Sequence, residues 1–189
     1  MNIIFPILAS VLQAGSFVID KVALSRFKIN YKTYNGVSYT LIFIITFIIF
    51  LFFEAPFSFD FFSGNLSLIL LILVVLGVVT NIIFYRALQF DELGEIQTIG
   101  LIKNIPIVIF ASLVFPDERN PVIVISTIVA SLAIIWSHYE HHHFKFAKKT
   151  WLYLFSTLFL TPLIPILIKE LLVVWHPISL SLIRSCATA

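Results

Sequence analysis

Charged side chains are scarce in this sequence. Asp, Glu, Lys and Arg make up only 12% of 189 residues, whereas hydrophobic residues make up 60%. A water-soluble domain carries about 25% charged residues, so this chain has too few polar groups to cover a soluble globule. The formal net charge of +2 is too small to indicate nucleic acid as a partner. With a mean hydropathy of +1.04, the composition predicts a protein whose outer solvent is the lipid bilayer.

Cysteine and catalytic motifs are also nearly absent. Cys186 is the only cysteine, so no disulfide can form within the chain and no redox compartment can be inferred. The sequence has no Ser-His-Asp order, no glycine-rich phosphate loop and no paired carboxylates, so nothing in it indicates an enzyme, a cofactor or bound ATP. No basic segment follows Met1, and we therefore expect the first apolar run to be retained as a helix rather than cleaved as a signal peptide.

Long apolar runs dominate the chain instead. Six of them approach the ~20 residues that a helix needs to cross the hydrocarbon core, and a seventh begins near Ile178 and stops at the chain end. We expect an all-α, polytopic membrane helix bundle. The runs are residues 3–19, 37–53, 66–88, 96–115, 122–136 and 151–168.

The connection between the fourth and fifth runs is predicted to be a tight hairpin. Pro116 ends one helix, Asn120 can cap the next helix, and Pro121 fits its first turn. We expect Glu118 and Arg119 to form a salt bridge in this hairpin, with a role in gating as the alternative.

Residue types at the ends and on one face of the runs indicate how they sit in lipid. Trp136, Trp151 and Trp175 all fall at the ends, where amphipathic rings prefer the headgroup region. In the fifth run, small residues at helical spacing predict a face for close packing between helices. These residues are Ser126, Ala130, Ala133 and Ser137.

Lys and Arg are concentrated in the odd-numbered connections between runs. Four of them lie in the first connection, whereas the second has neither Lys nor Arg. The positive-inside rule then places the odd connections in the cytoplasm and the N-terminus outside.

The two ends of the chain are weakly similar. Residues 3–21 form a run that ends in Asp20 and Lys21, and residues 151–169 form a similar run that ends in Lys169. Because five runs lie in the first unit, the second unit must begin from the opposite side of the membrane, as in the inverted repeats of transporters. The chain thus divides into a five-helix repeat (1–138), a polar His/Lys loop (139–150) and the incomplete start of a second repeat (151–189).

Several short motifs occur in an order and spacing typical of one group of permeases. They are Ala14-Gly15-Ser16-Phe17 with Lys21, Phe84-Tyr85-Arg86-Ala87-Leu88 at the end of the third run, the mid-helix Pro106, and Asp117-Glu118-Arg119 before the fifth run. With these motifs the chain resembles the drug/metabolite transporter (DMT) superfamily, specifically the EamA-type permeases. It departs from their pattern in the acidic turn 91–95, where small residues are usual.

This resemblance implies a secondary transporter, a permease or exporter of small metabolites or drugs in a prokaryotic plasma membrane. Such permeases work by alternating access between two inverted five-helix repeats, so we expect this chain to be a fragment or truncated product that ends one or two helices into the second repeat. They often have a cytoplasmic N-terminus, contrary to the charge rule. Two other functions stay open, a non-transporting membrane scaffold or partner subunit and a lipid-linked sugar flippase, as does assembly into a homodimer.

One cation lies inside the fourth run. Lys103 is near the middle of this run, where an ammonium costs at least ~2.5 kcal/mol on insertion scales. On a helical wheel, Gln97, Gly100 and Asn104 fall on the same third of the circumference. Asn81 in the third run is as far from the intervening turn as Lys103 is, so an antiparallel pair of helices places both at a similar depth.

We predict a polar site for a small solute or a coupling ion inside the membrane, with the ammonium contacting a carboxylate or other anion. Pro106 supports it by freeing the carbonyl of Ile102. The alternative is that the polar groups only satisfy one another, or bind a carboxylate from the rest of a longer chain. Asp20 and Lys21 face either a cavity mouth or the membrane interface, which we favour. The predicted site residues are Lys103, Asn81, Gln97 and Asn104.

A histidine-rich stretch follows the fifth run and invites a metal site, since imidazole and carboxylate suit zinc or nickel. No second ligand cluster accompanies it, and three consecutive imidazoles cannot all point at one ion from a helix. We therefore expect a loop that faces solvent or headgroups, with no bound metal. Its residues are His138, Glu140, His141, His142 and His143.

Overall fold

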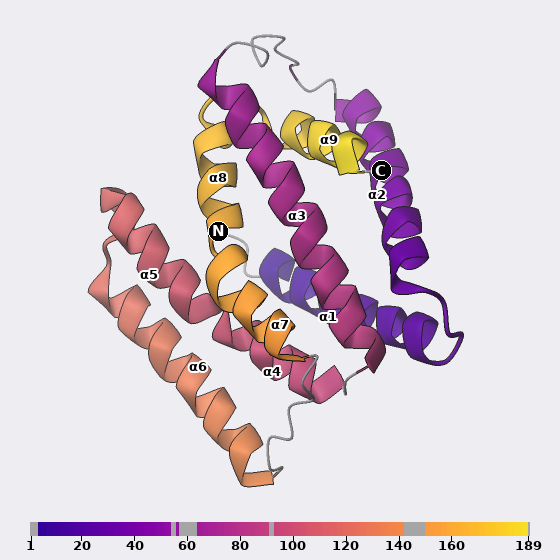
Figure 1. Cartoon of the computed structure of the whole chain (residues 1–189). Helices are drawn as coiled ribbons and strands as arrows, with labels where there is room; N and C mark the ends of the chain where they lie inside the picture. Colours follow the sequence, from indigo (N-terminus) through magenta and orange to yellow (C-terminus); the bar gives the residue numbers. More distant parts are fainter. Residues whose placement is uncertain (1–3, 54–55, 57–63, 91–92, 142–149, 189) are drawn as a thin grey trace.

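Helices are the regular structure of the computed structural model, which describes residues 4–53, 56, 64–90, 93–141 and 150–188 (Figure 1). They fall on the apolar runs, so the expected all-α class is confirmed. The elements are α1 (Ile4–Ser25), α2 (Tyr31–Phe53), α3 (Asn65–Phe90), α4 (Leu93–Ile102), α5 (Asn104–Val114), a 3-10 turn (Pro116–Glu118), α6 (Pro121–His141), α7 (Thr150–Phe155), a π-helical turn (Ser156–Leu160), α8 (Leu163–Leu172) and α9 (Pro177–Thr188).

Four helical stretches are long and apolar enough to cross a membrane. They are Ile7–Ser25, Tyr31–Phe53, Asn65–Phe90 and Trp151–Leu172. The other two predicted spans correspond to shorter apolar helices, Asn104–Val114 and Pro121–Ala133. Length and composition thus indicate a multi-pass membrane protein in which not every apolar run forms one long helix.

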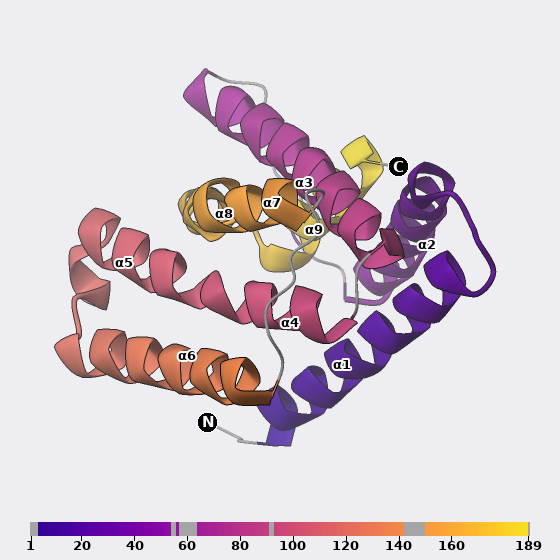
Figure 2. The same ribbon diagram turned by 60° about the horizontal axis from the view of Figure 1, so that its bottom comes forward.

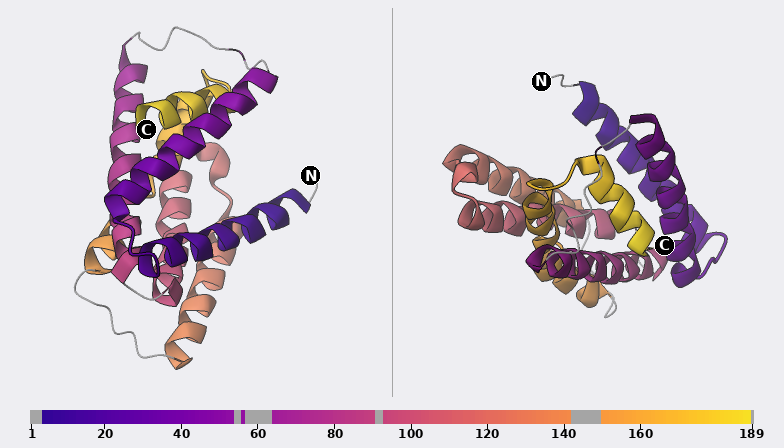
Figure 3. Two further views of the ribbon diagram at one scale, coloured as in Figure 1. Left: turned by 90° about the vertical axis from the view of Figure 1, so that its right-hand side faces the viewer. Right: turned by 90° about the horizontal axis from the view of Figure 1, so that it is seen from above.

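The central helix of the bundle is α3. It packs against α1, α2, α7, α8 and α9. Figure 2 shows α5 and α6 side by side, with α4 leading into α5. Two further views show α9 between α2 and α3, and it contacts both (Figure 3). Segments from the two ends of the chain therefore meet around α3.

The regular hydrogen bonding of the fourth apolar run is interrupted at Lys103, whose backbone keeps α-helical dihedral angles. Pro106 has no N–H, so the carbonyl of Ile102 loses its donor within the helix. The structure ends α4 at Ile102 and begins α5 at Asn104. Hydrogen bonding resumes when the Ile107 N–H donates to the Lys103 carbonyl at 3.1 Å. The sequence predicted the freed carbonyl, but it did not predict that one helix ends there and another begins.

A second interruption lies between α7 and α8. The Thr161 N–H donates to the carbonyl of Ser156, five residues earlier, at 3.0 Å, which is the π-helical pattern. Pro162 follows and cannot donate at all. The first run, which the proposed repeat pairs with this one, is continuous over Ile4–Ser25. The two runs thus differ locally, and the inverted repeat stays a prediction.

The hairpin between α5 and α6 has the expected form. A 3-10 turn covers Pro116–Glu118, and α6 begins at Pro121. The Asn120 side-chain oxygen accepts the N–H of Val122 at 3.0 Å. The predictions of the stop, the cap and the first turn are therefore confirmed.

Arg119 in this hairpin closes the end of α5. Its Nε donates to the Ser112 carbonyl at 3.0 Å, and its terminal nitrogen reaches the Leu113 carbonyl at 3.5 Å. These carbonyls lie in the last turn of the helix, where a cation is favourable. The side chain of Glu118, its predicted partner, lies outside the described residues.

Two clusters of buried apolar side chains form the interior. The first is Leu24, Ala87, Leu88, Ile96, Ile99 and Tyr153. The second is Leu73, Leu171, Trp175 and Leu180. Both clusters include side chains of α3, which explains why this helix holds the bundle together.

Trp175 corrects the prediction of three interfacial tryptophans. Trp136 and Trp151 are 67% and 61% exposed, but Trp175 is only 4% exposed. Its indole packs among leucines of α3, α8 and α9. Packing against other helices therefore replaces the headgroup contact that its place at a helix end suggested.

The packed face of α6 also differs from the prediction. Ser126, Ala130 and Ala133 are exposed, whereas Ser131 is only 4% exposed and Thr127 is half-buried. The described partners of α6 are α4 and α5. They cover a face about 100° around the helix from the predicted one. The fourth predicted residue, Ser137, has a side chain outside the described set.

Candidate functional site

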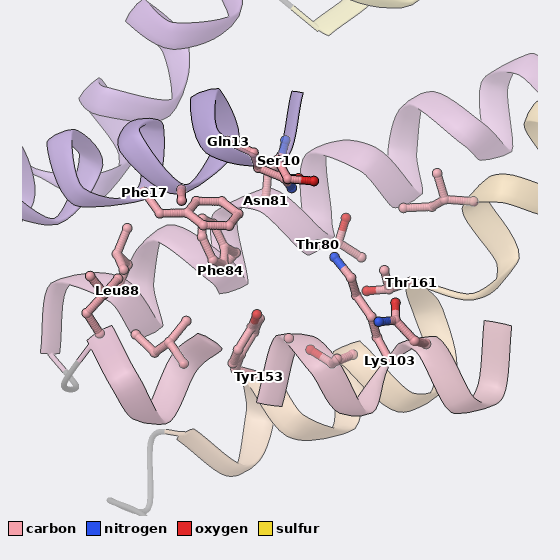
Figure 4. Close-up of a pocket in the computed structure, with 17 residues that line it drawn as sticks. Ser10, Gln13, Phe17, Thr80, Asn81, Phe84, Leu88, Lys103, Tyr153 and Thr161 are labelled. Carbon is pink, nitrogen blue, oxygen red and sulfur yellow. The ribbon is translucent and has the colours of Figure 1, made fainter. Parts of the chain in front are cut away.

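A cavity of about 570 Å³ lies between α1, α3, α4, α5 and the interrupted α7–α8 segment. Figure 4 shows side chains from these elements pointing into it. Its size falls in the range of about 300–1,000 Å³ that is usual for small-molecule sites. Its polar lining residues include Gln13, Thr80, Asn81, Lys103, Asn104, Thr157 and Thr161.

Lys103 enters the cavity from the break between α4 and α5. Figure 4 shows its side chain extending toward α3, with Thr80 and Thr161 nearby. Among the residues that the structure describes, its ammonium has no hydrogen-bond acceptor and no ion-pair partner. Desolvation opposes an ionised group in such a place. An anion in the cavity would offset that cost.

Three of the four predicted site residues line this cavity. Asn81 comes from α3, Lys103 from the break and Asn104 from the first turn of α5. The equal spacing of Asn81 and Lys103 from the intervening turn does bring them to one cavity. The side chain of Gln97 lies outside the described set, and the role of all four residues stays a prediction.

Asn81 is held in place by a tyrosine of α2. Its amide Nδ2 donates to the Tyr39 hydroxyl, and that hydroxyl donates in turn to the Gly77 carbonyl at 3.4 Å. This chain of hydrogen bonds satisfies a polar group that would otherwise be costly to bury. It leaves Lys103 as the charged member of the cavity lining that needs a counter-charge.

The rest of the cavity wall is aromatic and apolar. The rings of Phe17 and Phe84 have their centres 5.6 Å apart, and those of Phe84 and Tyr153 lie 5.8 Å apart. The Tyr153 hydroxyl passes close to the backbone at Gly100. A site with one cation and an aromatic wall is suited to an organic anion with an apolar body.

Asp20 and Lys21 are not among the residues that line the cavity. The Tyr34 hydroxyl donates to Asp20 Oδ1 at 2.5 Å, and Lys21 Nζ donates to the Leu88 carbonyl at 2.8 Å. These contacts tie the end of α1 to α2 and α3. The place of both residues at the membrane interface stays a prediction.

The contribution of α1 was not predicted from the sequence. Ser10, Gln13, Ala14 and Phe17 all line the cavity. Their spacing along the chain is i, i+3, i+4 and i+7, which is one helix face. Ser10 and Gln13, two polar residues on that face of an apolar run, could therefore have indicated these residues.

Arg184 on α9 was not predicted as a site residue either. Arg184 lines a smaller cavity of about 80 Å³ that shares Thr80, Asn81 and Ile164 with the larger one. A lone arginine within an apolar run is as informative as Lys103. Arg184 was not singled out because the seventh apolar run is short, so a charge within it did not stand out as buried in a span.

The histidine-rich stretch begins in a helix and not in the expected loop, since α6 extends through His138, Glu140 and His141. The side chains of these three residues, and His142 and His143 altogether, lie outside the described residues. Within the part of the chain that the structure describes, no three His, Cys, Asp or Glu side chains come together as metal ligands would.

No protein-family model, no curated protein and no solved structure matches this chain. The resemblance to EamA-type permeases thus depends on the sequence motifs alone, and function must be argued from the cavity.

Proposed function

We propose that this chain is part or all of a secondary transporter of the EamA type, which moves small organic anions across a membrane. The observation that carries the proposal is the ammonium of Lys103, which lines a cavity of about 570 Å³ between apolar helices. Among the described residues this ammonium has no counter-ion. A solute that brings its own negative charge supplies one.

The interrupted helices beside the cavity support transport. Lys103 lies at the break between α4 and α5, and Thr157 lies in the π-helical turn between α7 and α8; both line the cavity. Discontinuous helices around a central site are a recurring design of secondary transporters, in which helix ends and freed backbone groups meet the substrate or the coupling ion. Alternating access between two repeats is the mechanism that we propose.

The test is flux into liposomes that contain the purified chain. We would measure uptake of radiolabelled benzenesulfonate, hippurate and glutarate at neutral pH under an imposed ion gradient. These probes are charged and cross lipid slowly, so protein-dependent uptake above that of empty liposomes supports transport. Uptake of none of them, by protein that inserts normally, would reject the proposal and favour the membrane scaffold. Transfer of labelled lipid in the same vesicles would instead indicate a flippase.

Lys103→Ala is the decisive variant. We expect it to remove at least about 90% of the uptake, since a tenfold loss corresponds to about 1.4 kcal/mol, which is less than a desolvated charge pair contributes. Lys32→Ala is the matched control, because Lys32 is exposed at the start of α2 and does not line the cavity. Equal uptake by both variants, with equal amounts in the membrane, would show that Lys103 does not carry a transport site.

A further inference from the structure

The smaller cavity gives the proposed site a second cation. Arg184 reaches it from α9, where it is half-buried. Among the residues that the structure describes, its guanidinium has no hydrogen-bond acceptor and no ion-pair partner. Neither cavity is lined by a described Asp or Glu. Two cations thus line two cavities that share lining residues, without a described counter-charge in either.

The two cavities meet at one step of α3. Thr80 and Asn81 line both of them, as does Ile164 of α8. Lys103 lines the larger cavity and Arg184 lines the smaller one. Side chains that belong to both cavities mark them as neighbouring parts of one site.

The polar groups at the step already have partners. Thr80 Oγ1 donates to the carbonyls of Leu76 and Gly77, at 2.7 and 3.1 Å. The Asn81 amide donates to Tyr39, as described above. Neutral groups that are satisfied in this way supply no counter-charge to either cation. The attraction for an anion then comes from Lys103 and Arg184.

The sizes of the cavities indicate what each one holds. A volume of about 80 Å³ is close to that of two or three water molecules at ~30 Å³ each. It accommodates a single acid group but not a whole metabolite. A guanidinium presents a planar fork that matches a carboxylate in two hydrogen bonds. The larger cavity, with its aromatic wall, accommodates the body of the solute and its other acid group.

We propose that Arg184 forms a second anion-binding site next to that of Lys103, and that the solute is a small organic dianion with two separated acid groups. One acid group contacts Lys103 in the larger cavity, and the other contacts Arg184 in the smaller cavity. This inference rests on the proposed function, since it names the substrate class of the same site.

Calorimetric titration of the purified chain in detergent tests this inference directly. The probes are straight-chain diacids and the monoacids of equal carbon number: succinate with butyrate, glutarate with valerate, and adipate with hexanoate. We expect at least one diacid to bind about tenfold more tightly than its monoacid, which is the effect of one additional charge-assisted contact. Equal affinity within all three pairs would overturn the proposal of a second anion-binding site.

Arg184→Gln should reduce the affinity for that diacid to the level of its monoacid and leave the monoacid unchanged. Arg184→Lys keeps the charge and should retain part of the gain, which guards against a fold defect. Arg86→Gln is the control, because Arg86 is exposed on α3 and lines neither cavity. An unchanged diacid affinity in Arg184→Gln would also overturn the inference.

The proposed function has a separate point of failure. If monoacid affinity depends on Lys103 but Arg184→Gln changes no affinity, the proposed transporter site is supported and the second anion-binding site is rejected. If neither monoacids nor diacids bind, and Lys103→Ala has no effect, both proposals fail together.

Discussion

At the scale of single residues, polar side chains inside this bundle fall into two groups. Asn81, Tyr39 and Thr80 satisfy one another or nearby carbonyls. Lys103 and Arg184 have no described acceptor or counter-ion. Because a buried polar group without a partner is costly, the second group is where a ligand gains most from binding. This contrast is a better guide to function than polarity alone.

The bond between Tyr34 and Asp20 gives a prediction at this scale. Tyr34→Phe removes a hydrogen bond to a charged acceptor, which is worth about 1.5–3 kcal/mol, so we expect the free energy of unfolding in detergent to fall by a similar amount. Tyr31→Phe is the control, since the structure describes no hydrogen bond from the Tyr31 hydroxyl. Equal stability of the two variants would argue that Asp20 is not held by Tyr34.

At the scale of the elements, prolines explain where the apolar runs depart from continuous helix. Pro106 and Pro162 each remove a backbone donor, and the structure has its interruptions beside them. The sequence showed both prolines. Hydropathy alone could not show their effect, because a broken helix and an unbroken one have the same composition. The breaks matter because Lys103 and Thr157 line the cavity from them.

Two glycines offer a matched prediction on helix backbone. A Cβ on Gly100 would lie 3.7 Å from the Tyr153 hydroxyl, which is ordinary contact, whereas Gly64 has a φ of +71°. We expect Gly100→Ala to stabilise the chain by about 0.5–1 kcal/mol, since alanine is less flexible when unfolded. Gly64→Ala should destabilise it by about 1–2 kcal/mol, because its backbone is left-handed. Thermal unfolding of both variants in one detergent measures the difference, and a common sign would contradict the backbone assignment.

At the scale of the whole molecule, contacts between distant segments were the part that the sequence could not supply. Spans and turns follow from run length, prolines and caps, which are local properties. Trp175, Arg184 and the packed face of α6 depend on which helices become neighbours. The local sequence of a helix end or an apolar run does not determine which helix packs against it. For the same reason Asn81 and Lys103, which lie on adjacent runs, were the pair that could be brought together from spacing.

The cluster around Trp175 joins α8 and α9 to α3. Trp175→Ala removes a large side chain from among Leu73, Leu171 and Leu180, so we expect a loss of about 3–5 kcal/mol in unfolding free energy. Trp151→Ala should change it by less than about 0.5 kcal/mol, because Trp151 is 61% exposed. Chemical unfolding in detergent measures both. A small effect at Trp175 would mean that α9 contributes little to the bundle.

Lys103 has two places in the structure at once. The residue between α4 and α5 is also the one that carries the ammonium into the cavity. A substitution at this position therefore alters the charge of the cavity and the junction of the two helices together. The electrostatics of the cavity and the local geometry of the fourth apolar run thus depend on one amino acid.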